Sequence, residues 1–190
     1  DHFYTDRANA LEVLPNGNIV LAGTTALQNS SFQNMMLVML DEKGEKIWAK
    51  TYAAGPRSEA MDIMRSSDGN LLVAYDVFTA NGEAKSSWMK INPADGSVIW
   101  SRRAVPNSRL PKISRLQDGY LLTGDYVISP TDRDALAVKI NENGDVAWYK
   151  IFGEPGYEQL GECWQDPMGF IHCSGYHIEI NESQGIYVRF

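Results

Sequence analysis

The side chains most suited to catalysis in this sequence are few. Its histidines are His2, His172 and His177, and its cysteines are Cys163 and Cys173. A cysteine becomes a nucleophile when a neighbouring imidazole takes its proton. The odd spacing of His172 and His177 places them on opposite faces of an extended strand, although Cys163 and His172 can still pair across a hairpin. We favour a buried cysteine beside a packed histidine, so the sequence predicts no catalytic residue.

Motifs for hydrolysis and for metal binding are missing from the sequence. It contains neither Gly-x-Ser-x-Gly nor His-Glu-x-x-His. The turns DEKGE (41–45) and NENGDV (141–146) offer the oxygen ligands that calcium prefers, but each lacks the distal bidentate Glu of an EF-hand loop. Both are interpreted as hairpin turns. The sequence therefore predicts no metal and no cofactor.

The two cysteines are not spaced as metal ligands. Cys163 and Cys173 can face each other across one hairpin, in which case a disulfide is possible. The favoured interpretation is a pair of buried thiols, because free cysteine is among the residue types most often buried.

Composition indicates a globular protein and excludes several kinds of partner. With 44% hydrophobic residues, the 190-residue chain can bury a core. It has 17 basic and 24 acidic residues and no run of Lys or Arg, which argues against nucleic acid and anionic membranes. No apolar stretch approaches the roughly 20 residues of a membrane-spanning helix. The sequence shows no signal peptide and begins at Asp1, which we interpret as a processed or partial product.

One pattern recurs along the whole chain. A tight turn followed by an apolar run is found at 15–23, 67–75, 117–125 and 167–175. Its glycines are Gly17, Gly69, Gly119 and Gly169, spaced 52, 50 and 50 residues apart. A second landmark, a polar turn followed by a tryptophan, keeps nearly the same period at Trp48, Trp100 and Trp148. Two independent landmarks with one period indicate an internal repeat.

Each repeat predicts four short strands. In the second repeat these are EAMDIMRS, NLLVAYDV, SSWMKIN and VIWSRRA, which are rich in β-branched and aromatic residues. Asn-Gly and Asp-Gly between strands favour tight hairpins, because Gly accepts a positive φ. An ordinary β-sandwich would not need a fixed period, whereas four strands every 40–50 residues are typical of a β-propeller blade. The predicted fold class is therefore an all-β propeller.

We expect one propeller domain, or a fragment of one, over residues 1–190. Its predicted blade units are 8–58, 59–109, 110–159 and 160–190. The fourth unit has only three strands, and the residues DHFYT (1–5) look like the tail of a fourth strand. Either residues 1–5 complete the last blade of a four-bladed ring, or missing sequence completes a longer propeller. The second arrangement is slightly favoured, because four blades is the small end of the known range.

The repeats resemble those of bacterial seven-bladed β-propeller (SBBP-type) proteins, which are secreted or displayed on the cell surface. That repeat looks like D-G-G-[YF]-[IL]-[IVL]-x-G followed by [LV]-x-K-[LI]-[DN]-x-x-G-x-x-x-W-x-K-x-[YF]-G. AVKINENGDVAWYKIFG (137–153) fits the second half closely. LVMLDEKGEKIWAKTYAAG (37–55) fits with Met39 in place of Lys, and WMKINPADGSVIWSRRA (88–104) fits with one inserted residue. The resemblance implies a propeller and an extracytoplasmic location, and says little about function.

The Gly-Trp hairpins also resemble the docking motif of quinoprotein dehydrogenases, D-x-x-T-G-x-x-x-W. Those enzymes carry calcium and a quinone in the propeller channel. Nothing else in the sequence supports such a site. We therefore expect Trp48, Trp100 and Trp148 to pack between adjacent blades, and the turn glycines to be structural.

Loop lengths predict where a binding site lies. In an up-and-down blade the tight glycine turns lie at one end, and the second–third loops and the blade-to-blade links lie at the other, here called the loop end. The longer loops are predicted at 24–34, 78–86, 128–135 and 177–184, and the links at 53–59, 105–109 and 153–159. Binding usually uses such connections on a rigid scaffold.

Polar residues enter each innermost strand at the loop end. Aligned on the turn glycines, they are Arg7, Glu59, Arg109 and Gln159 at one position, and Asp62, Lys112 and Glu162 three places further on. These are the candidate ligand-binding residues, lining the mouth of a central channel. The alternative is a solvated funnel in which the charges pair across blades. Their mixed charge argues against a dedicated anion or cation site.

These features favour a non-catalytic binding or scaffold module of an extracytoplasmic assembly, which presents its loop end to a protein or a glycan. One alternative is an enzyme with a channel-mouth site, either glycan-active or quinoprotein-like. Its carboxylates would come from Glu59, Asp62, Glu158 and Glu162. Another alternative is a purely structural spacer. Further blades of a larger chain are a third kind of expected partner, besides protein and glycan.

Overall fold

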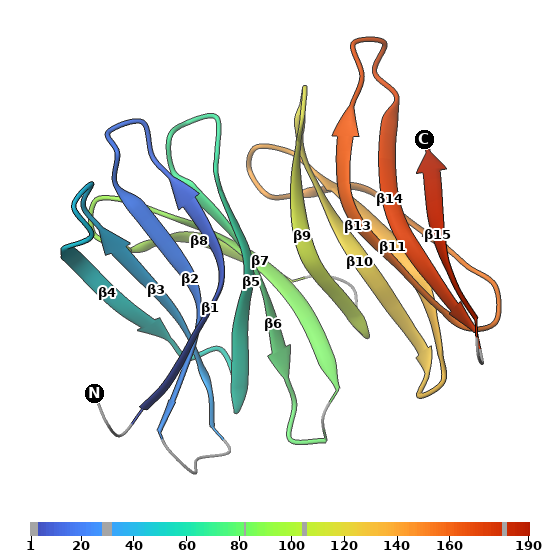
Figure 1. Cartoon of the computed structure of the whole chain (residues 1–190), viewed down its shortest axis with the longest axis horizontal. Helices are drawn as coiled ribbons and strands as arrows, with labels where there is room; N and C mark the ends of the chain where they lie inside the picture. The colour runs from blue at the N-terminus through green and yellow to red at the C-terminus, as the bar shows by residue number, and fades with distance from the viewer. Residues whose placement is uncertain (1–3, 28–31, 82, 104–105, 180–181) are drawn as a thin grey trace. The chain divides into compact units, whose positions relative to one another are not determined.

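The structure, a computed structural model, describes residues 4–27, 32–81, 83–103, 106–179 and 182–190 (Figure 1). The chain divides into two compact units, Asp1–Ala104 and Val105–Phe190. The described residues form 15 β-strands, so the predicted all-β class is confirmed. Among these residues there is no helix long and apolar enough to cross a membrane.

The first unit contains two antiparallel sheets of four strands each. The first sheet runs β1 (Tyr4–Val13), β2 (Ile19–Leu27), β3 (Asn34–Leu40), β4 (Lys46–Tyr52). The second runs β5 (Arg57–Arg65), β6 (Leu71–Phe78), β7 (Ala84–Ile91), β8 (Val98–Arg103). Each strand pairs with the next one in sequence, which is the up-and-down order that the repeat predicts. A parallel bridge between Gln33 and Arg57 joins the two sheets.

The second unit repeats this plan with one strand fewer. Its first four strands are β9 (Ser108–Leu116), β10 (Gly119–Ser129), β11 (Asp132–Ile140) and β12 (Val146–Phe152). Three more follow as β13 (Tyr157–Gln165), β14 (Ile171–Glu179) and β15 (Glu182–Arg189). A parallel bridge between Arg133 and Tyr157 joins the two groups, so they form one continuous sheet.

The core of each unit lies between its two groups of strands. In the first unit, one side is built from Val20, Leu37 and Met39, and the other from Leu71, Val73, Met89 and Ile91. In the second unit, Leu121 and Ala137 face Leu160, Ile171 and Cys173. Alternate residues of each strand point to one face, so the period-2 pattern of β3 gives alternating buried and half-buried positions. Face-to-face packing of neighbouring sheets is what removes these side chains from water.

Two of the repeated tryptophans lie between the two groups of strands of their own unit. The Trp48 indole donates a hydrogen bond to the Pro93 carbonyl at 3.0 Å. The ring of Trp148 lies 5.9 Å from the ring of Phe190, which follows β15. Trp100 lies under the guanidinium of Arg102, 5.2 Å from its ring centre.

The turn glycines differ in what they do. Gly17, Gly69 and Gly169 have φ values of 83°, 84° and 93° and close similar turns. Gly119 has φ 123°, is the first residue of β10 and pairs with Leu116 across a two-residue turn. A Cβ at Gly119 would overlap the carbonyl oxygen of Ile140. Gly119 is therefore required for a close approach of backbones as well as for its φ.

Two predicted loops are wrong. The prediction placed loops at 128–135 and 177–184, but β10 and β11 pair up to Ser129 and Asp132, and β14 and β15 up to Glu179 and Glu182. The polar residues of these two segments belong to strands, because exposed positions at the end of a sheet do not require apolar side chains. The tips of the loops predicted at 24–34 and 78–86 lie partly outside the described residues.

The N-terminal residues also differ from the prediction. Tyr4 and Thr5 pair with Leu27 and Ala26, and so extend β1. They do not form the tail of a separate outer strand. Residues 1–3 lie outside the described residues, and the four blade boundaries stay a prediction.

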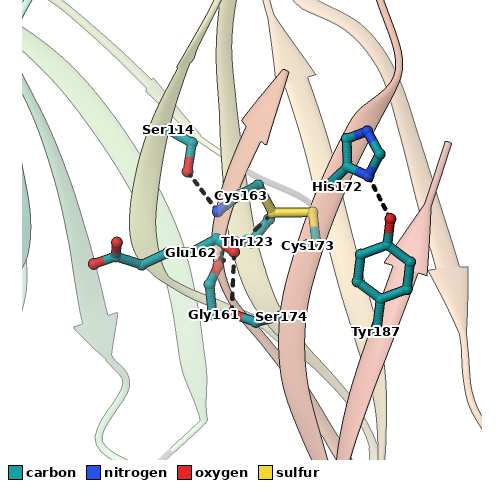
Figure 2. Close-up of a disulfide and its surroundings, with 9 residues drawn as sticks. All are labelled: Ser114, Thr123, Gly161, Glu162, Cys163, His172, Cys173, Ser174 and Tyr187. Carbon is teal, nitrogen blue, oxygen red and sulfur yellow. Dashed lines mark hydrogen bonds between the residues drawn. A yellow bond between two sulfur atoms is a disulfide. The ribbon is translucent and has the colours of Figure 1, made fainter. Parts of the chain in front are cut away.

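The cysteines form a disulfide, so the favoured prediction of two thiols is wrong (Figure 2). Cys163 on β13 and Cys173 on β14 are directly opposed, with their Cα atoms 4.1 Å apart. The alternative in which Cys163 pairs with His172 is not found, because Cys163 is bonded to Cys173. The two ring nitrogens of His172 instead contact Tyr187 Oη and, at 2.9 Å, Asp166 Oδ2. Sequence spacing allowed the disulfide, but the register of the hairpin was needed to show that the two residues are opposed.

Replacing the two kinds of turn glycine should give different losses of stability. Gly69→Ala meets only the end of the Arg65 side chain at 3.8 Å, so it carries the left-handed backbone cost of about 1–2 kcal/mol. Gly119→Ala adds a clash with the Ile140 carbonyl and should cost more. Urea unfolding of both variants measures the difference. Equal losses would contradict the requirement for close approach at Gly119.

Removing the disulfide should destabilise the second unit. The bond closes a loop with a sequence separation of 10, for which the chain-entropy estimate is about 2–3 kcal/mol. We expect the double variant Cys163→Ser, Cys173→Ser to lose up to that amount in denaturant unfolding. Adding a reductant to the wild type should give the same loss and should leave the double variant unchanged. A loss in the variant that reductant does not reproduce would point to packing rather than to the crosslink.

Candidate functional site

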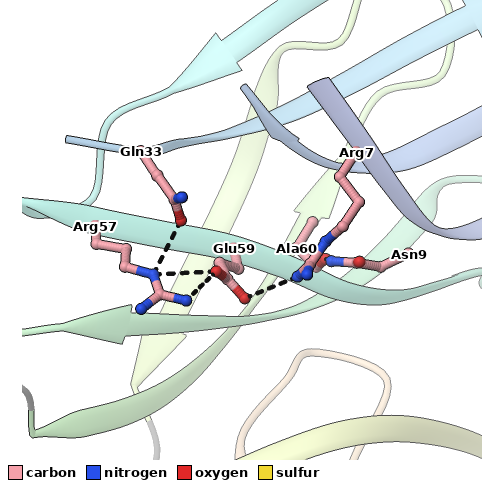
Figure 3. A network of polar contacts seen from close by, with 6 residues as sticks. All are labelled: Arg7, Asn9, Gln33, Arg57, Glu59 and Ala60. Atoms are coloured by element: carbon pink, nitrogen blue, oxygen red, sulfur yellow. Dashed lines mark hydrogen bonds and ion pairs between the residues drawn. The ribbon is translucent and has the colours of Figure 1, made fainter. Parts of the chain in front are cut away.

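Two of the predicted polar residues of the first unit, Arg7 and Glu59, meet in one network centred on Glu59 (Figure 3). The Glu59 side chain is 7% exposed and accepts hydrogen bonds from Arg57 at 2.6 Å and Arg7 at 3.3 Å. Gln33 accepts from the same Arg57 guanidinium at 2.9 Å. Both carboxylate oxygens of Glu59 are therefore paired with arginine, so its charge is neutralised. Asp62 lies further along β5, and its Oδ1 accepts the backbone N–H of Ile63 at 2.9 Å.

The predicted residues of the second unit form looser contacts. Lys112 Nζ lies 3.7 Å from Glu162 Oε1, and the two side chains are 42% and 80% exposed. An ion pair this exposed contributes little to stability. Gln159 accepts a hydrogen bond from Tyr176 Oη. Arg109 lies close enough to Asp125 to lower the pKa of that buried carboxyl, against the larger effect of burial, which raises it.

Within each unit these charges pair across neighbouring groups of strands, as Arg7 with Glu59 and Lys112 with Glu162. That arrangement is the one expected of a solvated funnel. Their role in ligand binding stays a prediction.

A second cluster, at the loop end of the second unit, is built around a buried carboxylate. Glu158 is the second residue of β13, and its side chain is 6% exposed. Its Oε1 contacts His177 Nδ1 and accepts the Glu154 N–H at 3.3 Å. The other ring nitrogen of His177 lies 3.2 Å from Glu179 Oε1. The imidazole thus lies between two carboxylates.

The other oxygen of Glu158 points toward Gly153. A Cβ at Gly153 would lie 2.9 Å from Glu158 Oε2 and 2.5 Å from Asp134 Oδ1. Two carboxylates therefore converge on a residue that has no side chain. Burial, together with the charges of Asp132 and Glu158, raises the pKa of Asp134. We call Glu158, His177, Glu179, Asp134 and Gly153 the acidic cluster.

The same positions in the first unit carry neutral residues. In the first unit Ser58 pairs with Val77. In the second unit the residues at the same positions plus 100, Glu158 and His177, pair with each other. Met35 pairs with Tyr52, and Ala135 pairs with Phe152, at the same offset. The equivalents of Asp134 and Gly153 are thus Asn34 and Ala53. The fold itself does not require the acidic cluster.

Two cavities open at this end of the second unit. One, of about 270 Å³, is lined by Gly153, Glu154, Glu158, His177, Glu179, Gln184 and Ile186. The other, of about 680 Å³, is lined by Thr131, Pro155, Gly156, Tyr157, Ile178 and Glu179. Glu179 belongs to both. The larger cavity has apolar walls, and the smaller one is lined by carboxylates.

Sequence reasoning found part of this site. It named the loop end and included Glu158 among four carboxylates. It considered His177 only as a possible catalytic histidine and did not single out Asp134 or Gly153, because these residues in polar stretches carry no motif. The signal that could have found them is the repeat itself: at an offset of 100, Ala53, Asn34, Ser58 and Val77 become Gly153, Asp134, Glu158 and His177.

Comparison with known proteins supports the fold and leaves the family open. No protein-family profile and no curated protein sequence matches the chain. The β-propeller domain of the Trilobed protease from Pyrococcus furiosus matches with a TM-score of 0.53 and 10% identity, over 99% of this chain and 58% of that one. The acylaminoacyl peptidase of Pyrococcus horikoshii matches with a TM-score of 0.52 and 12% identity, over 96% of this chain and 32% of the peptidase.

The chain shares the β-propeller fold. It spans less than two thirds of either of these solved structures. At such identities the likeness concerns the fold alone, and it carries no information about activity.

The His177 contacts predict a pH-dependent contribution to stability. Hydrogen bonding to Glu158, followed by that to Glu179, raises the pKa of His177 above its ordinary value. The pairing stabilises the fold fully below the pKa that His177 has in the unfolded chain. That stabilisation is lost as pH rises through the higher folded value. We expect His177→Gln to lose more stability at about pH 5.5 than at about pH 9.

Unfolding in urea at both pH values, with the exposed Gln184→Ala as the matched control, measures this difference. NMR titration of the His177 imidazole reads its pKa directly. A folded pKa below that of a free histidine would contradict the pairing.

Proposed function

We propose that the chain is a non-catalytic binding module, and that the loop end of its second unit recognises a protein partner. The observation that carries this proposal is the pair of adjoining cavities at that end, of about 680 and 270 Å³, which share Glu179. Ligand sites are typically concave, with apolar walls and a few polar groups that fix orientation. Here Pro155, Tyr157 and Ile178 supply the apolar walls.

Two hydrogen bonds hold the wall of the larger cavity in place, which favours a role in recognition. The Tyr157 hydroxyl donates to the Pro130 carbonyl at 2.6 Å, and the Asp132 carboxylate accepts the Gly156 N–H at 3.1 Å. These bonds hold the link between β12 and β13 against the β10–β11 hairpin. A pre-formed surface of this kind reduces the entropy cost of binding.

A protein is favoured over a glycan by the chemistry of the walls. The larger cavity offers an exposed aliphatic side chain, Ile178 at 41%, beside a proline. Such surfaces bury apolar side chains of a partner. The enzyme alternative is less supported, because Glu59 is neutralised by two arginines and Glu162 lies in solvent beside Lys112.

We also propose that the chain consists of consecutive blades of an extracytoplasmic propeller of the SBBP type. The equal offset of 100 residues between paired positions in the two units supports this repeat structure. The Cys163–Cys173 disulfide supports an oxidising location, because such bonds persist outside the reducing cytosol. Further blades or a larger assembly would complete the propeller.

The binding proposal predicts that substitutions at the two ends of the second unit have different effects. Immobilised protein is screened against a displayed random-peptide library and a glycan array. Ile178→Asp, in the larger cavity, should weaken any peptide that binds by at least about tenfold. Val146→Asp, at the tight-turn end and similarly exposed at 48%, is the matched control and should leave binding unchanged. Binding of glycans alone, no binding at all, or equal loss in both variants would contradict the proposal.

A further inference from the structure

One carboxylate oxygen of the acidic cluster is buried and unsatisfied. Glu158 Oε2 has no hydrogen-bond partner among the described residues, although the Glu158 side chain is 94% buried, being 6% exposed. It points toward Gly153, and both residues line the cavity of about 270 Å³. A buried acceptor without a donor costs free energy, and more so when it is charged. Such a group is a strong candidate for contact with a ligand.

The charges around this cavity are unbalanced. Glu154, Glu158 and Glu179 line it, and Asp134 approaches Gly153 from β11. The only cationic group among the described lining residues is His177, which lies between Glu158 and Glu179. One imidazolium cannot neutralise four carboxylates, so the cavity favours a cation.

The first unit shows that these charges are not needed for folding. There, Ser58 Oγ accepts the Met35 N–H at 3.1 Å, and its hydroxyl lies 3.4 Å from the Tyr52 carbonyl. The serine is fully buried and satisfied by backbone groups of the neighbouring sheet. At the equivalent place the second unit has a carboxylate, with Gly153 in place of Ala53 to make room for it. A costly charge that the fold can do without indicates a function.

We propose that this cavity binds an organic cation, an alkylammonium or guanidinium group of the partner protein, with Glu158 Oε2 as its principal acceptor. The inference rests on the proposed function for its location and names the chemistry recognised there. Charge-assisted N–H···O bonds to a buried carboxylate are stronger than neutral ones, and they would satisfy the free oxygen. Gly153 places no side chain between Glu158 Oε2 and the cavity that both residues line. A metal ion fits less well, because the described residues contain no group of three or more His, Cys, Asp or Glu side chains placed to hold one.

The test uses small probes on the whole chain, followed by NMR. The probes are N-acetyl-lysine amide, N-acetyl-arginine amide, the uncharged N-acetyl-norleucine amide and calcium chloride. We expect the lysine or the arginine probe to shift the amide of Gly153 and the imidazole of His177 in a saturable way. The two amides show whether an ammonium or a guanidinium is preferred. Shifts caused equally by norleucine amide, shifts caused by calcium alone, or no shifts would overturn the proposal.

Variants that copy the first unit supply the controls. Glu158→Ser places in the second unit the residue that the first unit carries, so this variant is expected to fold. The Cβ of Gly153→Ala would meet the carboxylate ends of the flexible Asp134 and Glu158 side chains, which can shift, so this variant is expected to fold as well. Glu158→Ser removes the acceptor, and Gly153→Ala keeps every charge but fills the approach. Each should weaken probe binding at least about tenfold. Glu45→Gln, an exposed carboxylate of the first unit, should leave it unchanged. Probe binding that survives Glu158→Ser in a folded protein would overturn the assignment.

The same variants separate this inference from the proposed function. If Ile178→Asp abolishes peptide binding while no cationic probe binds, the cation site fails and the binding module stands. If the probes bind as expected but no peptide is retained, the cation site stands as a local property and the protein-binding function fails.

Discussion

The structure of each unit depends on the place where the chain passes from its first group of strands to its second, here called the joint. In the first unit the chain leaves β4, forms a parallel bridge from Arg57 to Gln33 and enters β5. In the second it leaves β12, bridges Tyr157 to Arg133 and enters β13. The residue directly after each bridge is buried. Ser58 as a whole residue is 0% exposed, and Glu158 is 5% exposed. Any polar group placed there must find its hydrogen bonds within the joint, because solvent does not reach it.

The two units satisfy the buried polar group at the joint in different ways. A serine hydroxyl is small enough to be satisfied by backbone groups of the adjoining sheet, and nothing else has to change. A glutamate is longer, so it needs space and counter-charge. The second unit supplies space with Gly153 and part of the charge with His177, while Asp134 adds a further negative group. The four differences at this joint are thus one coupled change, and the buried charge that results remains only half satisfied.

The sequence predicted the repetitive parts of this structure well, and the coupled parts poorly. The period, the four-strand order and the all-β class follow from landmarks that recur, since each copy supports the others. The disulfide, the short hairpins at Ser129–Asp132 and Glu179–Glu182, and the different role of Gly119 depend on register, which a single residue of slippage changes. Most residues of the candidate site were not assigned to it from the sequence, for the opposite reason to the one that made the fold predictable. The site consists of positions where one copy departs from another, and an alignment on shared glycines discards those positions.

Charge pairing explains where in this fold a polar site can arise. Most of the charges that sequence reasoning singled out are compensated within the unit that carries them. Glu59 has two arginines, and Glu162 has a lysine and the solvent. A compensated charge gains little from a ligand, because the incoming group must compete with a partner already in place. Glu158 differs because its pairing is complete at one oxygen and absent at the other among the described residues. Incomplete pairing at a buried position, rather than the number of charges, is therefore what distinguishes Glu158 from the compensated charges of this repeat.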